Sequence, residues 1–218
     1  MKMKAIVVAF LILATATLGS FFRPDVRPGY GVTGIGWLSD YFTPLKGTNM
    51  DTPIYFMDSG NEGPTFLLMG GTHGREISGT TAALVFIENV VVTKGRVIVM
   101  PFSNISGVSI PDETGKAPHF IQVETKSGPR FLVYGDRRTD PVDQGIPDPV
   151  VFMHAQSGFT LEDGTEARNL NRQYPGVADG NPTQQLAYAI IEMIKAEKVD
   201  FNLDMHESGT PDEYIDER

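Results

Sequence analysis

Two short segments carry residue types that together can bind a metal ion. His73 and Glu76 lie three residues apart at the end of an apolar run, and His206 follows Asp204 at the end of a run in which polar and apolar residues alternate. Two histidines and one glutamate form one of the ligand sets that catalytic zinc uses, with a fourth position left for water. These residues predict a zinc-dependent hydrolase that binds one Zn²⁺ per chain.

Each half of this pattern also has a simpler interpretation. Glu76 could favour the positive end of a helix dipole, and His206 could belong to a polar strand end in water. The two halves together favour the metal site, because both would leave a sheet at its carboxyl edge, where open α/β sheets bind ligands. Asp204 lies two residues before His206 on the same strand face, so it could orient the imidazole from behind.

The elements that would position these residues alternate between strands and helices. Apolar or alternating runs predict strands at residues 52–57, 65–69, 96–101 and 199–206. Helical patterns occupy residues 76–92 and the stretch that begins at Asn181-Pro182, whose buried stripe would be Leu186, Ala187, Ile190, Met193 and Ile194. This order predicts an α/β fold with a mostly parallel or mixed sheet flanked by helices.

Two long segments lack a sustained periodic pattern of apolar residues. Residues 21–51 and 103–180 are rich in glycine and proline, and they predict irregular structure except for a strand near residues 131–134. Long irregular segments in a compact domain often carry function.

The N-terminal segment predicts export. Lys2 and Lys4 precede an apolar stretch, and Ala14-Thr15-Ala16 matches the small-residue pattern of a signal-peptidase site. The stretch is shorter than the ~20 residues that span a bilayer comfortably, so residues 1–20 favour a cleaved signal over an uncleaved membrane anchor. The expected location is periplasmic or extracellular, with membrane contact only through this segment.

Composition limits the classes of partner that the chain could bind. The chain has a net charge of −9 and no basic stripe, which argues against nucleic acid. It contains no cysteine, so it has neither a lipid-attachment cysteine nor a disulfide framework.

Two further segments carry hydrogen-bond donors. Asn171 and Arg172, in the segment at residues 167–176, could hold a carboxylate or polarise a carbonyl oxygen. Arg137 and Arg138 could add another positive donor. The alternative is that both segments are polar surface loops.

Together these motifs resemble the succinylglutamate desuccinylase/aspartoacylase branch of the zinc carboxypeptidase superfamily. That family's pattern is H-x-x-E, then N-R, then D-x-H at a strand end, and the chain has all three in this order. The resemblance runs from about Pro53 to the end. The sequence is also similar to exported bacterial members of this branch at Gly135–Arg137, Pro147–Pro149, Arg168–Gly176 and Asp204–Glu207.

The resemblance implies a zinc-carboxypeptidase-like deacylase domain over residues 21–218. Zinc would be held by His73, Glu76 and His206, with Asp204 behind them, and the reaction would be hydrolysis of an amide.

The resemblance also implies roles for the donors. Arg172 and Asn171 would hold a substrate carboxylate, and Arg168 would also bind the substrate. Arg137 or Arg168 would stabilise the developing oxyanion. The partner would be a small molecule or short peptide that carries a carboxylate.

One expected residue is missing. Family members place a general-base glutamate on a strand well downstream of the third zinc ligand, but the sequence ends soon after His206. Glu207 is adjacent to His206, so on an extended strand it would point to the opposite face. We therefore expect the chain to be a fragment, an incomplete copy of a longer enzyme.

Three functions fit these observations. The first is deacylation of an N-acyl amino acid or a similar small amide. The second is a metallocarboxypeptidase that acts on peptides. The third is a non-catalytic zinc-binding remnant that captures carboxylate ligands through Arg172.

Overall fold

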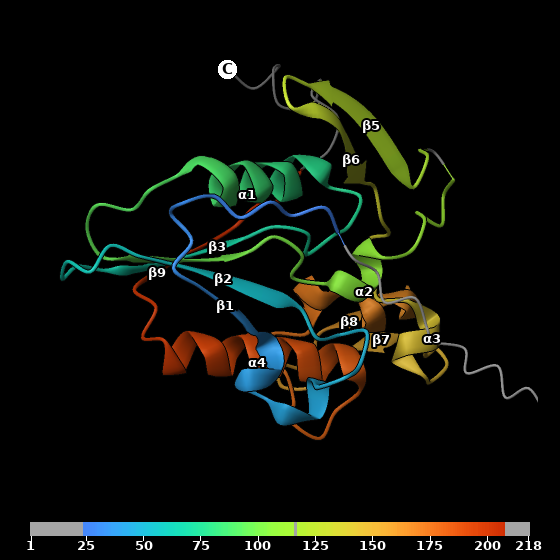
Figure 1. The fold of residues 1–218 in the computed structure, drawn as a ribbon. Coiled ribbons are helices and arrows are strands. Elements are labelled where there is room, and N and C mark those ends of the chain that lie inside the picture. The colour runs from blue at the N-terminus through green and yellow to red at the C-terminus, as the bar shows by residue number, and fades with distance from the viewer. Residues whose placement is uncertain (1–23, 116, 208–218) are drawn as a thin grey trace, which may run out of the picture.

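The computed structural model describes residues 24–115 and 117–207 (Figure 1). The predicted signal segment and the residues that follow Glu207 lie outside these ranges. Within the described part of the chain, no helix is long and apolar enough to cross a membrane.

A five-stranded sheet forms the centre of the fold. Its strands, in spatial order, are β1 (Gly34–Trp37), β2 (Pro53–Asp58), β4 (Arg96–Met100), β3 (Thr65–Met69) and β9 (Phe201–Asp204). The strands β4, β3 and β9 are parallel, whereas β2 is antiparallel to both β4 and β1. The prediction of a mostly parallel or mixed sheet flanked by helices is confirmed.

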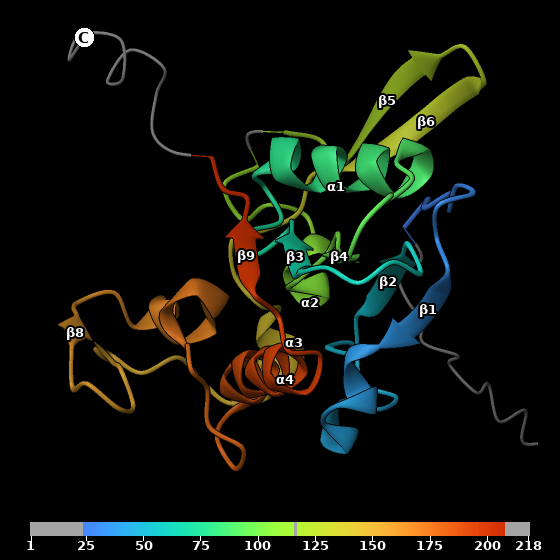
Figure 2. The ribbon, with the colours of Figure 1, turned by 90° about the vertical axis from the view of Figure 1, so that its left-hand side faces the viewer.

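Two long helices cover opposite faces of this sheet (Figures 1 and 2). They are α1 (Ile77–Asn89) and α4 (Pro182–Ala196). The first connects β3 to the parallel neighbour β4, as a crossover must. The second begins at the predicted point, where the Asn181 side chain accepts from the backbone N–H of Gln184 in a capping box.

The strand sequences explain why both faces are buried. Leu67 and Met69 of β3 belong to the cluster on the α4 side, while Leu68 belongs to the cluster on the α1 side. Successive strand residues point to opposite faces, so a strand between two helix layers reads as a continuous apolar run. The predicted stripe of α4 is also confirmed, since Leu186, Ala187, Ile190 and Met193 are fully buried and Ile194 is partly buried.

The remaining elements are short. They are α2 (Ile105–Val108), α3 (Pro141–Gln144), the hairpins β5 (Phe120–Thr125) with β6 (Gly128–Val133) and β7 (Phe152–Met153) with β8 (Thr160–Leu161), and the 3₁₀ turns η1 (Leu38–Asp40), η2 (Thr43–Leu45), η3 (Gly164–Arg168) and η4 (Leu170–Arg172). The sequence predicted β6 but neither its partner β5 nor β1. The four residues of β1 include two glycines, and they are too few to show a period.

Candidate metal centre

The loop after β3 carries His73 into a tight corner. Gly71 has φ +68°, a left-handed conformation that glycine adopts without strain. A Cβ on Gly74 would lie 2.7 Å from the carbonyl oxygen of Asp136, so this position also needs glycine. The backbone N–H of Gly74 donates to that same oxygen at 2.7 Å. The irregular segment that contains Asp136 therefore holds the loop in place, and His73 is 3% exposed.

Three side chains converge at this corner. His73 Nδ1 lies 2.6 Å from Glu76 Oε1, and His206 Nδ1 lies 2.9 Å from Glu76 Oε2. One ligand atom from each residue lies within 4.8 Å of the others, which is the spacing of a metal-binding group. The sequence placed Glu76 in the first turn of a helix, but the structure places it at the N-cap of α1, one residue before the helix begins.

The outer nitrogen of each imidazole faces an oxygen. His73 Nε2 lies 3.0 Å from Asn169 Oδ1, and His206 Nε2 lies 3.0 Å from Asp204 Oδ2. Asp204 in turn accepts from the Thr72 hydroxyl at 2.9 Å. The sequence motifs indicated Asp204 but not Asn169, although Asn169 lies only two residues before Asn171 in the same motif.

These contacts test whether the group suits a metal ion. A neutral imidazole has one N–H, and oxygen acceptors at Nε2 draw that hydrogen to the outer side of each ring. The Nδ1 lone pairs of both histidines then face the carboxylate of Glu76, and such an arrangement is repulsive unless protons or a cation lie between them. Two imidazole nitrogens and one carboxylate oxygen are a ligand set that Zn²⁺ accepts, so the residues fit the ion.

The charges in the cluster shift two pKa values. Burial alone would raise the pKa of Glu76, but hydrogen bonds from His206 and His73 outweigh it and hold that pKa well below its usual range. Hydrogen bonding to Asp204 first, and to Glu76 second, raises the pKa of His206 to about 10. Glu76 is therefore ionised, and His206 carries a proton that a metal ion would replace.

Arginines lie next to this cluster around the carboxylate of Glu166. Arg172 Nε is 3.2 Å from Glu166 Oε2, and Arg137 Nε is 3.7 Å from Glu166 Oε1. The Arg172 side chain is 40% exposed, so its guanidinium can meet a ligand from solvent. The Asn171 side chain is exposed, and its backbone N–H donates to Asn169 Oδ1 at 3.1 Å.

Arg168 is held in the interior by partners of its own. Its side chain is 6% exposed, and its Nε donates to both oxygens of Asp148, at 2.9 and 3.0 Å. One terminal nitrogen donates to the carbonyl oxygen of Thr139 at 2.7 Å. A buried guanidinium needs such partners, and through these contacts Arg168 joins two loops.

Glu207 also has an identified contact. Its Oε1 accepts from the backbone N–H of Ser78 at 2.7 Å, and its own N–H donates to Glu76 Oε2 at 3.1 Å. A carboxylate at the first turn of α1 suits the helix dipole. The Glu207 side chain is therefore held at the start of α1.

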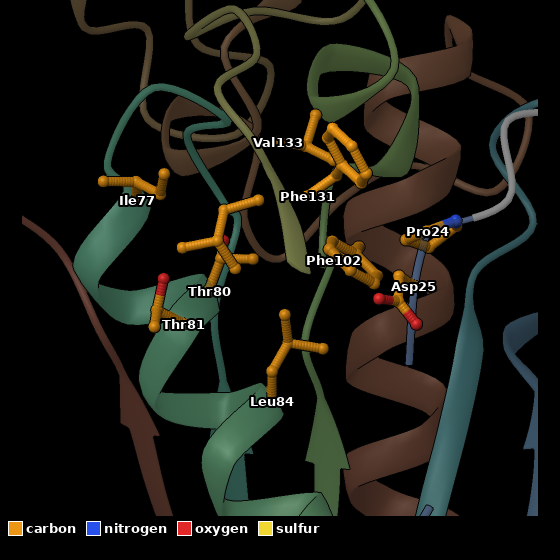
Figure 3. A pocket seen from close by; sticks show the side chains of 10 residues that line it. Pro24, Asp25, Ile77, Thr80, Thr81, Leu84, Phe102, Phe131 and Val133 are labelled. Atoms are coloured by element: carbon orange, nitrogen blue, oxygen red, sulfur yellow. The ribbon is translucent and has the colours of Figure 1, made fainter. Parts of the chain in front are cut away.

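A separate pocket lies between α1 and β6 (Figure 3). It is lined mainly by apolar residues of α1 and β6, and it includes none of the residues of the metal-binding group. Its charged lining residue, Asp25, is paired with Arg27 at 2.7 Å and with Arg130 at 2.9 Å. We assign this pocket to packing between α1 and the β5–β6 hairpin.

Comparison with known proteins identifies relatives of the chain. No protein-family model matches it. It is 28% identical over 153 residues to an N-alpha-acetyl-L-2,4-diaminobutyric acid deacetylase of Halomonas elongata, a match that covers 68% of the chain and 30% of that protein.

Solved structures with a similar fold carry related names. A succinylglutamate desuccinylase/aspartoacylase of Rhodobacter sphaeroides is 23% identical, with a TM-score of 0.44 over 73% of the chain and 34% of that protein. An aspartoacylase family protein of Mesorhizobium loti is 22% identical, with a TM-score of 0.43 over 85% and 42%. A product-bound ectoine utilization protein of Ruegeria pomeroyi is 22% identical, with a TM-score of 0.44 over 72% and 33%.

The chain spans less than half the length of each of these proteins. Within that span its identity to them is 22–28%.

Proposed function

We propose that the chain forms the metal-binding part of a zinc-dependent deacylase that cleaves the amide of an N-acyl amino acid. The observation that carries the proposal is the arrangement of the two imidazoles. Both turn Nδ1 toward Glu76, and both have Nε2 held by an oxygen of a neighbouring side chain. Side chains that hold the outer nitrogen of a ligand histidine are a regular part of zinc sites.

Zinc bound at this group would act as a Lewis acid toward a water and the scissile carbonyl. The chain's own residues would do the rest. The Asn169 and Asp204 side chains keep the two rings oriented, and burial of His73 excludes water from one side of the centre. Arg172 and Asn169 both hydrogen-bond Glu166, which links the Arg172 guanidinium to the same corner. From there the guanidinium could bind a substrate carboxylate.

The substrate class rests on two supports. The Halomonas elongata relative is named as a deacetylase of an N-acetylated amino acid, a molecule with a carboxylate beside the amide. Arg172 and Arg137 offer positive charge next to the ligand group. A panel of N-acyl amino acids and short peptides would separate this proposal from a carboxypeptidase, because preferred cleavage of the peptides would contradict it.

Zinc stoichiometry tests the metal assignment directly. The purified full chain should hold one zinc, measured by elemental analysis, and His73→Ala should lose it because one of three ligands is gone. His154→Ala is a matched control, since His154 binds the carbonyl oxygen of Tyr174 and lies outside the group. A wild-type chain without zinc, or full retention in His73→Ala, would refute the ligand assignment.

A further inference from the structure

Glu166 is a buried carboxylate that lies between the ligand group and the arginines. It is 7% exposed and belongs to η3. Its Oε2 accepts from Asn169 Nδ2 at 2.7 Å and from Arg172 Nε at 3.2 Å. Its Oε1 accepts from a terminal nitrogen of Arg138 at 3.1 Å and lies 3.7 Å from Arg137 Nε. One carboxylate thus contacts an amide on the metal side and three guanidinium groups on the other.

These partners keep Glu166 ionised. Burial by itself would raise its pKa, but the hydrogen bond from Asn169 and the charges of Arg137 and Arg138 outweigh burial and lower the pKa. A buried carboxylate without such partners would be strongly destabilising, so these contacts are what allow Glu166 to be buried as an anion.

The contact with Asn169 determines which end of that amide faces His73. Asn169 Nδ2 donates to Glu166, so its Oδ1 is turned toward His73 Nε2 at 3.0 Å. The backbone N–H of Asn171 donates to the same Oδ1 at 3.1 Å. If the amide were reversed, its NH₂ would oppose the N–H at His73 Nε2. Glu166 therefore favours the tautomer of His73 whose Nδ1 is free to bind a metal.

The contacts of Glu166 with the arginines have a different effect: they weaken the attraction of those arginines for an anion. Glu166 binds the Nε edge of Arg172 and lies close to Arg137, so its negative charge offsets theirs. A substrate carboxylate that approaches these guanidiniums meets a smaller positive charge than two free arginines would present.

We propose that Glu166 is a positioning residue that strengthens metal binding through Asn169 and His73 while it weakens the attraction of the arginines for the substrate carboxylate. This inference rests on the proposed function. It assigns one residue two effects of opposite sign, and simple damage to the fold would weaken both kinds of binding.

The test uses Glu166→Gln in the full chain. Zinc affinity, measured by competition with a chelator, should fall by about 10-fold, because glutamine can present its own NH₂ to Asn169 and no longer fixes the amide. At saturating zinc, succinate should bind at least about threefold more tightly by calorimetry, because the competing charge is gone.

Glu113→Gln is the matched control. Glu113 also bonds Arg138, at 2.5 Å to the other terminal nitrogen, but it is half exposed and no hydrogen bond links it to Asn169 or Arg172. Both affinities should stay at the wild-type values. Equal changes in Glu113→Gln and Glu166→Gln would overturn the proposal, because any partner of Arg138 would then suffice.

A double-mutant cycle tests the route through Asn169. Asn169→Ala should weaken zinc binding, and adding Glu166→Gln to it should cause no further loss, because Glu166 acts through the amide. Additive losses would overturn the proposal, as would a Glu166→Gln protein that changes only one of the two affinities or weakens both.

A second variant keeps the test decisive if Glu166→Gln does not fold. Glu166→Asp keeps the charge that the arginines need but withdraws the carboxylate from Asn169, so zinc affinity should fall. Unchanged zinc affinity in Glu166→Asp would then overturn the proposal. The proposed function fails separately, since it fails when the wild-type chain binds no zinc at all.

Discussion

The two histidines of the ligand group are supported in different ways. His73 is 3% exposed, and its outer nitrogen faces the neutral amide of Asn169, which lies 96 residues further along the chain. The His206 side chain is 28% exposed, and its outer nitrogen faces the charged carboxylate of Asp204, only two residues before it. His73 thus depends on a distant segment, whereas His206 is supported by the last residue of the strand β9, which immediately precedes it.

This difference has a physical reason. Next to buried Glu76 and Glu166, a further carboxylate behind His73 would add a third negative charge to a region that excludes water, which is costly. An amide bonds the ring without that charge. Beside His206, water can solvate a carboxylate, so Asp204 is tolerated there. The two halves should therefore respond differently to removal of their supports.

The largest expected effect is that of Asn169→Ala. We expect about a 10- to 100-fold loss of zinc affinity, as for other residues that orient ligand histidines. Because His73 Nε2 would then be buried without a partner, the metal-free protein should also lose about 1–3 kcal/mol of unfolding free energy. Chelator competition and urea unfolding measure the two quantities.

Asn171→Ala is the control for this change. It removes an amide from the same motif, but that side chain is exposed. Zinc affinity and stability should both stay near the wild-type values. If Asn171→Ala and Asn169→Ala behave alike, burial is not what distinguishes the support of His73.

A smaller effect should appear in the pH dependence on the His206 side. Its pKa is raised to about 10 in the metal-free protein, so zinc must displace a proton at any lower pH. Zinc affinity should therefore rise with pH, by up to about tenfold per unit from this residue at pH values below 10. Because the folded-state pKa is raised, the proton's contribution to metal-free stability is complete below about pH 6.5 and is lost as pH rises through 10.

Asp204→Asn sharpens this comparison. It keeps an oxygen for the Thr72 hydroxyl but removes the charge that holds the proton on His206. The rise of zinc affinity between pH 7 and 8.5 should become shallower, which chelator competition at several pH values would measure. A slope identical to that of the wild type would show that Asp204 does not control this proton.

The smallest effect concerns a residue outside both halves. Asn181→Ala removes the N-cap of α4, whose side chain accepts from Gln184 N at 3.0 Å, and should lower the free energy of unfolding by about 1 kcal/mol. Zinc affinity should not change, because α4 supplies none of the ligand group. A clear loss of zinc affinity would mean that general destabilisation can imitate the effects expected at Asn169.

Much of the fold follows from local patterns. The buried run at residues 65–69 matches β3 residue for residue, and the helix start at Asn181-Pro182 matches α4. These patterns were readable because periodicity, capping residues and apolar runs act over a few neighbours. The short strands β1 and β5 were not identified, because β1 has only four residues and β5 is almost entirely exposed, so burial imposes little pattern on either.

The candidate site also has a part that could be predicted from the sequence and a part that could not. The ligand types and their order along the chain were evident from His73, Glu76 and His206, because metal chemistry restricts which side chains can take part. The contrast between Arg168 and Arg172 was not evident. Both are arginines of one motif, yet Asp148 binds the first in the interior, whereas the second remains partly exposed beside Glu166.

The sequence by itself thus determined the strand–helix order and the three residues, His73, Glu76 and His206, that meet at the candidate metal centre. Only the tertiary structure decided which residues hold those ligands in place. It brought Asn169 and Glu166 behind His73 across 96 and 93 residues of chain, because folding places the end of η3 against the corner after β3. Such contacts depend on long-range packing of irregular segments, which leaves no periodic trace in the order of the amino acids.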